Sequence, residues 1–116
     1  MISEKNMNKF LAVGVNKVDK VWHGHFGISP YFQIYNREGE MIEKRINPHG
    51  AGHGHRDDQV DNQPFLIKDI LHDCTIFIGK KMGKASKQKL AQKLGIEAIL
   101  TETTDPNEVV KNILTK

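Results

Sequence analysis

The chain has little cysteine: of its 116 residues only Cys74 is a cysteine. One cysteine cannot form a disulfide within the chain, and it cannot build a structural zinc module that needs two or more thiolates. A free thiol suits a reducing compartment, and no apolar run approaches the length of a membrane span. Residues 1–8 are polar and lack the apolar centre of a signal peptide, so we expect a frayed N-terminus and a cytoplasmic protein.

Strong charge of either sign is also missing. The net charge is +3, which is too small to predict a nucleic-acid-binding surface. The hydrophobic fraction of 38% is that of an ordinary globular protein, and 116 residues suffice for one domain with one core. Since the sequence contains neither an internal repeat nor a linker, we predict a single domain over residues 1–116 that binds neither nucleic acid nor a membrane.

Histidine, by contrast, is concentrated in two tracts whose members are separated by glycines. The first tract holds His23 and His25, and the second holds His49, His53 and His55. Neutral imidazole is the commonest protein metal ligand, and short histidine-rich tracts are typical of metal binding. Histidines two residues apart do not share a helix face, so we expect two loops, which can meet over a metal ion or a metal cluster. The alternative interpretation is a pair of solvated polar loops.

Apolar patterning predicts an α/β domain with a mixed five-stranded sheet. Strands are expected at 10–15, 31–35, 41–46, 75–78 and 96–100, and helices at 64–73, 85–94 and 106–114. The runs at 10–15, 75–78 and 96–100 are nearly continuous and predict core strands. We expect 10–15 in the centre, between 75–78 and 31–35. The more polar run at 41–46 predicts an exposed strand that pairs with 31–35 in a hairpin.

Two loops leave core strands at their carboxyl ends, which is where open α/β sheets bind ligands. The loop after Val15 carries the first histidine tract. The loop after Ile78 carries a lysine pair bounded by glycines: Gly79, Lys80, Lys81 and Gly83. Because this second loop opens a helix, its free amide groups and its lysines predict an anion site. The alternative is ordinary solvation of the lysines.

Cys74 precedes a predicted core strand, where it is either a small buried hydrophobe or, as a thiolate, a ligand for a soft metal. Enzyme chemistry has weaker support. The strand at 10–15 carries no carboxylate for a two-metal nuclease, and Ser29 and Ser86 lack the context of a nucleophile elbow. An open metal site on the histidine loops can activate water, but no other feature of the sequence requires a hydrolase.

The segment His25-Phe26-Gly27, followed by 30–35, resembles the opening signature of the dinitrogenase iron–molybdenum cofactor-binding family, which includes the NifX and NafY carriers and the tail of NifB. The likeness covers most of residues 9–114, including the stretch at 73–78 and the loop at 79–83. It implies a ribonuclease H-like fold without nuclease activity, in which three helices flank the mixed sheet. It also implies that an iron–sulfur or heterometal cluster binds, with the histidine of the motif as candidate ligand.

Together these observations predict a non-enzymatic carrier or accessory protein for an iron–sulfur or iron–molybdenum-type cluster, acting with a protein that donates or accepts the cluster. The alternatives are a mononuclear zinc or nickel binder and, third, a metal-dependent hydrolase. The oligomeric state stays open. The candidate metal ligands are His23, His25, His49, His53, His55 and Cys74. The residues predicted to contact the cofactor are His25, Phe26, Gly27, Gly79, Lys80, Lys81 and Gly83.

Overall fold

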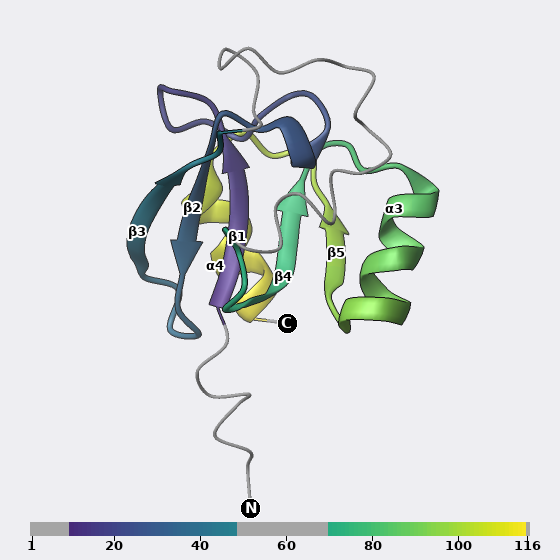
Figure 1. Ribbon diagram of the computed structural model, residues 1–116. Coiled ribbons are helices and arrows are strands. Elements are labelled where there is room, and N and C mark those ends of the chain that lie inside the picture. The colour runs from purple at the N-terminus through teal and green to yellow at the C-terminus, as the bar shows by residue number, and fades with distance from the viewer. Residues whose placement is uncertain (1–9, 49–69, 116) are drawn as a thin grey trace, which may run out of the picture.

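The computed structural model describes residues 10–48 and 70–115, which form one α/β domain (Figure 1). The five strands are β1 (Phe10–Val15), β2 (Tyr31–Tyr35), β3 (Met41–Ile46), β4 (Cys74–Gly79) and β5 (Glu97–Leu100). The helical elements are the 3-10 helix η1 (Phe26–Ile28), α3 (Lys84–Lys89), its π-helical continuation η3 (Leu90–Leu94) and α4 (Pro106–Leu114). No helix in the two described ranges is long and apolar enough to cross a membrane.

One sheet contains all five strands, in the order β3-β2-β1-β4-β5. β1 pairs antiparallel with β2 and parallel with β4, and β4 pairs parallel with β5. β3 forms an antiparallel hairpin with β2 and lies at the edge. The prediction of a mixed sheet with 10–15 in its centre is therefore confirmed. The continuous apolar run of this segment indicated the central position, because a central strand is buried on both faces.

Two apolar cores lie on opposite faces of the sheet, because alternate residues of a strand point to opposite sides. In β1, Leu11 and Val13 belong to the core beneath α4, whereas Ala12 belongs to the core on the other face. Val110 of α4 is completely buried in the first core, and α4 lies behind the sheet in Figure 1. Leu90 of η3 packs into the second core.

Local sequence signals set the helix ends. The Asp105 side chain accepts a hydrogen bond from the backbone N–H of Asn107 (3.0 Å) and caps α4, and Pro106 occupies its first turn. The helix that starts with α3 ends at Gly95, whose φ of 66° is the left-handed conformation that glycine adopts without strain. Ile96 donates its N–H to a carbonyl of η3 (2.9 Å), so β5 begins one residue later than predicted.

The helix predicted at 64–73 is not confirmed. Its first six residues lie outside the described ranges, and 70–73 form a turn closed by the N–H of Cys74 and the carbonyl of Leu71 (3.0 Å). The guanidinium of Arg45 in β3 holds this turn, because it donates to both carboxylate oxygens of Asp73 at 2.8 Å. The described residues thus contain two α-helices rather than three, and the ribonuclease H-like assignment stays a prediction.

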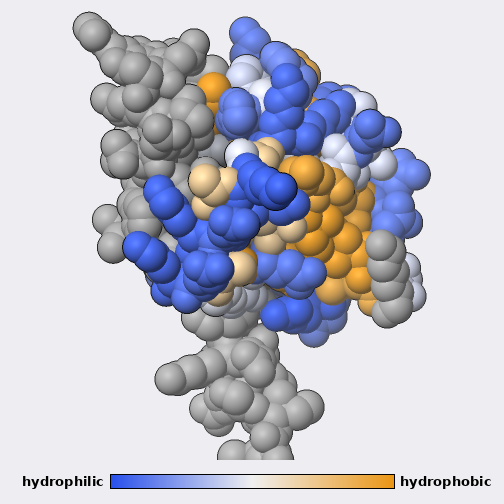
Figure 2. All heavy atoms as spheres, turned by 90° about the vertical axis from the view of Figure 1, so that its right-hand side faces the viewer, coloured by the Kyte–Doolittle hydropathy of each residue, from blue (hydrophilic) through white to orange (hydrophobic). Residues whose placement is uncertain are grey.

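β5 departs from its predicted role as a core strand. It lies at the edge of the sheet, and its last residue, Leu100, is 47% exposed. Figure 2 shows apolar side chains gathered on one face of the molecule, and along β5 and α4 a groove is lined by Ile99, Val109 and Ile113. Since α4 packs over β1 in the centre of the sheet, the outer strand stays partly uncovered.

Candidate metal centre

The carboxyl ends of β1, β4 and β5 lie at one edge of the sheet, because these three strands are parallel. We call this the carboxyl edge. The loops that follow the strands are bonded to one another there: the N–H of Thr101, just after β5, donates to the carbonyl of Gly79 (2.9 Å). The N–H of Val21, in the loop after β1, donates to the carbonyl of Thr104 (2.8 Å). This is the edge at which the sequence predicted a ligand site.

His25 and Lys81 lie side by side at the carboxyl edge. They form an isolated parallel bridge, and the N–H of Phe26 donates to the carbonyl of Lys81 (2.9 Å). The histidine segment and the lysine loop are distant in sequence and are joined here through their backbones. Because the bridge fixes both main chains, the Cα of His25, from which the imidazole side chain extends, lies at a defined position next to the lysine loop.

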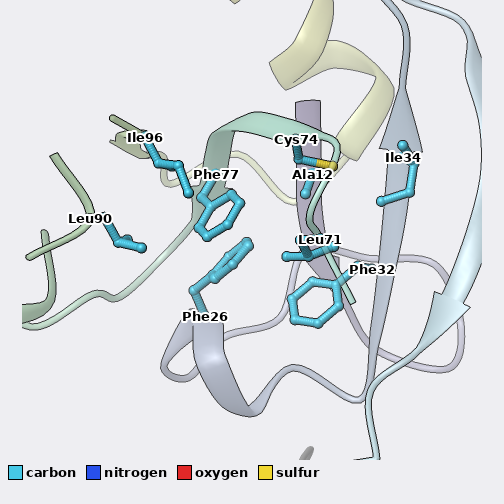
Figure 3. Close-up of a cluster of buried hydrophobic side chains, with 9 residues drawn as sticks. All are labelled: Ala12, Phe26, Phe32, Ile34, Leu71, Cys74, Phe77, Leu90 and Ile96. Atoms are coloured by element: carbon cyan, nitrogen blue, oxygen red, sulfur yellow. The ribbon is translucent and has the colours of Figure 1, made fainter. Parts of the chain in front are cut away.

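Phe26 anchors the histidine segment in the core. It is only 3% exposed, and the centroid of its ring lies 4.9 Å from that of Phe77 and 5.0 Å from that of Phe32. Figure 3 shows the three rings grouped in the core on the face of the sheet opposite α4. Such separations are those of favourable aromatic pairs. Any movement of the backbone next to His25 would therefore disturb the core.

The sheet backbone approaches the histidine segment closely at two glycines. A Cβ added to Gly79 would lie 3.2 Å from the Cβ of Phe26, and one added to Gly14 would collide with the Oγ of Ser29. Ser29 is completely buried, and its hydroxyl donates to the carbonyl of Phe26 (2.8 Å). Gly79, which the sequence placed in an anion-binding loop, is therefore also needed for the packing beneath the histidine segment.

Asn47 supports the site and was missed by sequence reasoning. It is completely buried, and its side-chain amide donates to the carbonyls of Gly27 (3.0 Å) and Ser29 (2.9 Å). Its backbone N–H donates to the carbonyl of Pro30 (3.0 Å). Asn47 thereby ties the end of β3 to the histidine segment. A lone asparagine belongs to no periodic pattern or motif, so its role depends on the fold.

Two imidazoles and two ammonium groups from the predicted site lie at the carboxyl edge. His25 is partly buried and His23 is exposed. Lys80 is partly buried, with its Nζ 3.5 Å from the Oγ1 of Thr104, and Lys81 is exposed. Imidazole nitrogen suits iron, zinc, copper or nickel, and an ammonium group can only donate hydrogen bonds. This donor set fits an anionic metal cluster that brings its own bridging ligands.

Cys74 lies at the opposite edge of the sheet from His25. It begins β4 and pairs with Phe10 at the start of β1, whereas Gly79 ends β4 at the carboxyl edge. Six strand residues span roughly 16 Å, so the structure does not bring the thiol to the histidines. Burial raises the pKa of the Cys74 thiol to about 12, and the Asp73 carboxylate adds to the shift, so the thiol is protonated at neutral pH.

The second histidine tract, His49, His53 and His55, lies outside the described residues, so its convergence with the first tract stays a prediction. Within 10–48 and 70–115, no three histidine, cysteine, aspartate or glutamate side chains are grouped so that they could hold a metal ion. Of the predicted ligands, the structure places His23 and His25 at the carboxyl edge.

The protein is thus an α/β domain whose carboxyl edge carries a histidine segment bonded to a lysine loop. Residues 7–116 match the protein family described as dinitrogenase iron-molybdenum cofactor, and the chain belongs to this family. The resemblance that was drawn from the segment His25-Phe26-Gly27 is thereby confirmed.

Solved structures that are similar to this one include the following two. The apo form of the orange protein from Desulfovibrio gigas has a TM-score of 0.67 at 18% identity, and the match covers 92% of this chain and 88% of that chain. The crystal structure of PH0822 has a TM-score of 0.61 at 20% identity, and the match covers 91% of this chain and 90% of that chain. At these identities the likeness concerns the fold alone. A comparison with curated protein sequences found no match.

Proposed function

We propose that this protein binds and carries an iron–sulfur or iron–molybdenum-type cluster, as a non-catalytic accessory factor in metallocluster assembly. The observation that carries the proposal is the bridge between His25 and Lys81, which sets an imidazole beside the lysine loop at the carboxyl edge. Membership in a family described by the iron-molybdenum cofactor of dinitrogenase supports the same kind of cargo.

His25 is the candidate ligand because its backbone is held in place before any cargo arrives. The bridge to Lys81 holds it on one side, and the buried ring of Phe26 holds the next residue in the core. A preorganised side chain loses less conformational entropy on binding than one on a free loop. Its imidazole can supply a neutral nitrogen to iron, as histidine does in some iron–sulfur centres.

Lys80 and Lys81 complement a cargo that carries negative charge. Sulfide bridges give clusters hydrogen-bond acceptor atoms, and the reduction potential of a cluster depends on its net charge and on the hydrogen bonds to its sulfur atoms. Ammonium groups at the carboxyl edge would stabilise an anionic cluster by charge and by hydrogen bonds. Lys81 is exposed, so this attraction is open to screening by salt. Retention of the cargo should therefore weaken as ionic strength rises.

Carriage requires that the cargo can leave. His23 and Lys81 are exposed, so a cluster bound beside them is within reach of a second protein. A partner that offers soft thiolate ligands would take the cluster over, because thiolates bind iron–sulfur clusters in preference to harder ligands. The partners we propose are accordingly proteins that donate or accept a metallocluster.

Anaerobic reconstitution with ferrous iron and sulfide tests the proposal. We expect the parent to retain both elements and to show the visible absorption of a cluster. We expect His25→Ala to retain at least about tenfold less, since losing even a group that supports a ligand costs that much. His72→Ala is the matched control and should behave like the parent, because His72 is exposed in the turn that precedes β4, at the opposite edge.

Three other outcomes would contradict the proposal. Zinc or nickel bound in stoichiometric amount, without sulfide, would favour a mononuclear metal-binding function. Steady turnover of phosphoesters or peptides by the metal-loaded protein would show a hydrolase. Equal retention of the cluster by His25→Ala and by the parent would move the site away from His25.

A further inference from the structure

Trp22 carries a buried nitrogen that has no hydrogen-bond partner. In the part of the chain that the structure describes, its Nε1 is the single buried side-chain nitrogen or oxygen in this condition. Ser29 and Asn47, two buried polar residues of the same edge, use their side chains in hydrogen bonds. A buried donor without a partner is unfavourable, so its presence calls for an explanation.

Gly24 lies directly against this nitrogen. A Cβ added to Gly24 would lie 2.8 Å from the Nε1 of Trp22, which is too close for a carbon atom. The three atoms nearest to such a Cβ all belong to the indole ring. Any other residue at position 24 would therefore press carbon against the donor and keep an acceptor atom away from it.

The main chain of Trp22 is held by β1, and its indole ring lies beside His23, one of the candidate ligands. The backbone N–H of Trp22 donates to a carbonyl of β1 (2.9 Å), and the centroid of its ring lies 4.4 Å from that of His23. The next anchored residue along the chain is Phe26, whose N–H is bonded to the lysine loop. The three residues between these anchors, 23–25, thus hold both imidazoles in one short segment next to Trp22.

We propose that the indole N–H of Trp22 donates a hydrogen bond to a sulfide or oxygen atom of the bound cluster, beside the imidazoles of His23 and His25. This role rests on the proposed function. Indole nitrogen can only donate, and hydrogen bonds to sulfur are among the interactions by which proteins tune clusters. A hydrated metal cation turns hydrogen atoms outward and gains nothing from such a donor. Trp22 therefore favours a sulfide-rich anion over a hydrated cation.

Binding requires a local rearrangement. The Nε1 of Trp22 is closed to solvent in the free protein, so an acceptor atom reaches it only when residues 23–24 move relative to the indole. The segment is bonded at both ends, at Trp22 and at the bridge between His25 and Lys81, which confines the movement to these two residues and leaves the main chain of His25 in place. The unpaired donor is thus a feature that destabilises the free state and is relieved in the loaded state.

Two replacements of Trp22 test the inference in the full chain. Trp22→Phe keeps an aromatic ring beside His23 and removes the N–H. Because the chain has one tryptophan, it can also be replaced during expression by benzothienylalanine, which keeps the shape of indole and has sulfur in place of N–H. Both proteins, the parent and His25→Ala are reconstituted with ferrous iron and sulfide. Cluster retention, Zn²⁺ affinity and the urea midpoint of the free protein are then measured.

We expect both replacements to retain the cluster about tenfold less than the parent, the effect of one hydrogen bond to a charged group. Zn²⁺ affinity should be unchanged. The urea midpoint of the benzothienylalanine protein should not fall, because a donor without a partner does not stabilise the free state.

If both Trp22 replacements retain as much cluster as the parent while His25→Ala loses it, the role of Trp22 is overturned and the proposed function stays intact. Equal losses of cluster and Zn²⁺, or a lower urea midpoint with benzothienylalanine, would show that Trp22 is merely structural and would also overturn it. A parent that retains no cluster would refute the proposed function and the role of Trp22 together.

Discussion

Asp73→Asn removes the negative charge that ties the turn before β4 to the edge strand β3. In the parent, Arg45 donates to both carboxylate oxygens of Asp73 at 2.8 Å, and it also donates to the carbonyl of Ile70 at 2.6 Å. The Arg45 side chain is 20% exposed and that of Asp73 is 23% exposed, so water screens the pair only in part. A two-pronged pair of this kind contributes more than an exposed surface ion pair.

The magnitude follows from the pKa of the Asp73 carboxyl. Hydrogen bonds from Arg45, opposed by burial, lower this pKa from 3.8 to about 2. A shift of this size corresponds to roughly 2.5 kcal/mol, and partial exposure reduces the expected contribution to about 1–2 kcal/mol. Because the folded-state pKa is depressed, the stabilisation is fully present above the unfolded-state value and is lost as the pH falls through about 2.

Urea unfolding at a series of pH values measures the effect. Near neutral pH, we expect the free energy of unfolding of Asp73→Asn to lie about 1–2 kcal/mol below that of the parent. The difference should shrink as the pH approaches 2, where the parent's own carboxyl becomes protonated. Asp19→Asn is the matched control, because the Asp19 carboxylate also bonds a cation, Lys44 at 2.7 Å, but its side chain is 56% exposed. It should lose much less stability.

Two results would refute this account of the ion pair. If Asp73→Asn and Asp19→Asn have the same free energy of unfolding near neutral pH, the two-pronged contact with Arg45 adds no stability beyond that of an exposed ion pair. A difference between parent and Asp73→Asn that stays constant down to a pH of about 2 would show that the loss does not come from the carboxylate charge.

Three other experiments test the site and its supports. Gly79→Ala should lower the free energy of unfolding in urea by about 1–3 kcal/mol, because the added methyl group would lie 3.2 Å from Phe26; an unchanged value would show that the ring can give way. Lys81→Glu should speed the loss of a reconstituted cluster at low salt, whereas Lys93→Glu, exposed in η3, should not; equal rates would remove Lys81 from the site. The Cys74 thiol, whose pKa burial raises to about 12, should react with a thiol reagent at neutral pH only after unfolding, and prompt labelling of the folded protein would contradict its burial.

Elements whose causes are local could be predicted from the sequence. The continuous apolar run of β1 indicated a central strand, and the alternation of its side chains between two cores explains why the run is continuous. Asp105 and Gly95 mark helix ends through groups only a few residues away. The strand order then implied that the loops after β1 and β4 leave the same edge of the sheet.

Contacts between distant segments could not be predicted. Arg45 closes a turn where periodicity suggested a helix, and Asn47 binds carbonyls of a loop that precedes it by many residues. The exposure of β5 depends on how far α4 extends across the sheet, which no pattern within either element reveals. Each of these features is set by a partner that folding brings near, so the sequence around it carries no periodic sign of it.

At the candidate site, the available chemistry can be read from the sequence, because the motif of His25 and the pair Lys80 and Lys81 are short segments whose side chains define what can bind. Which of these groups meet depends on the three-dimensional arrangement of the strands. The parallel pairing of β1 with β4 brings His25 against Lys81 and leaves Cys74 at the other end of the same strand. The reason is physical: hydrogen bonds between strands set the register of segments far apart in the chain, and register decides which loop ends become neighbours.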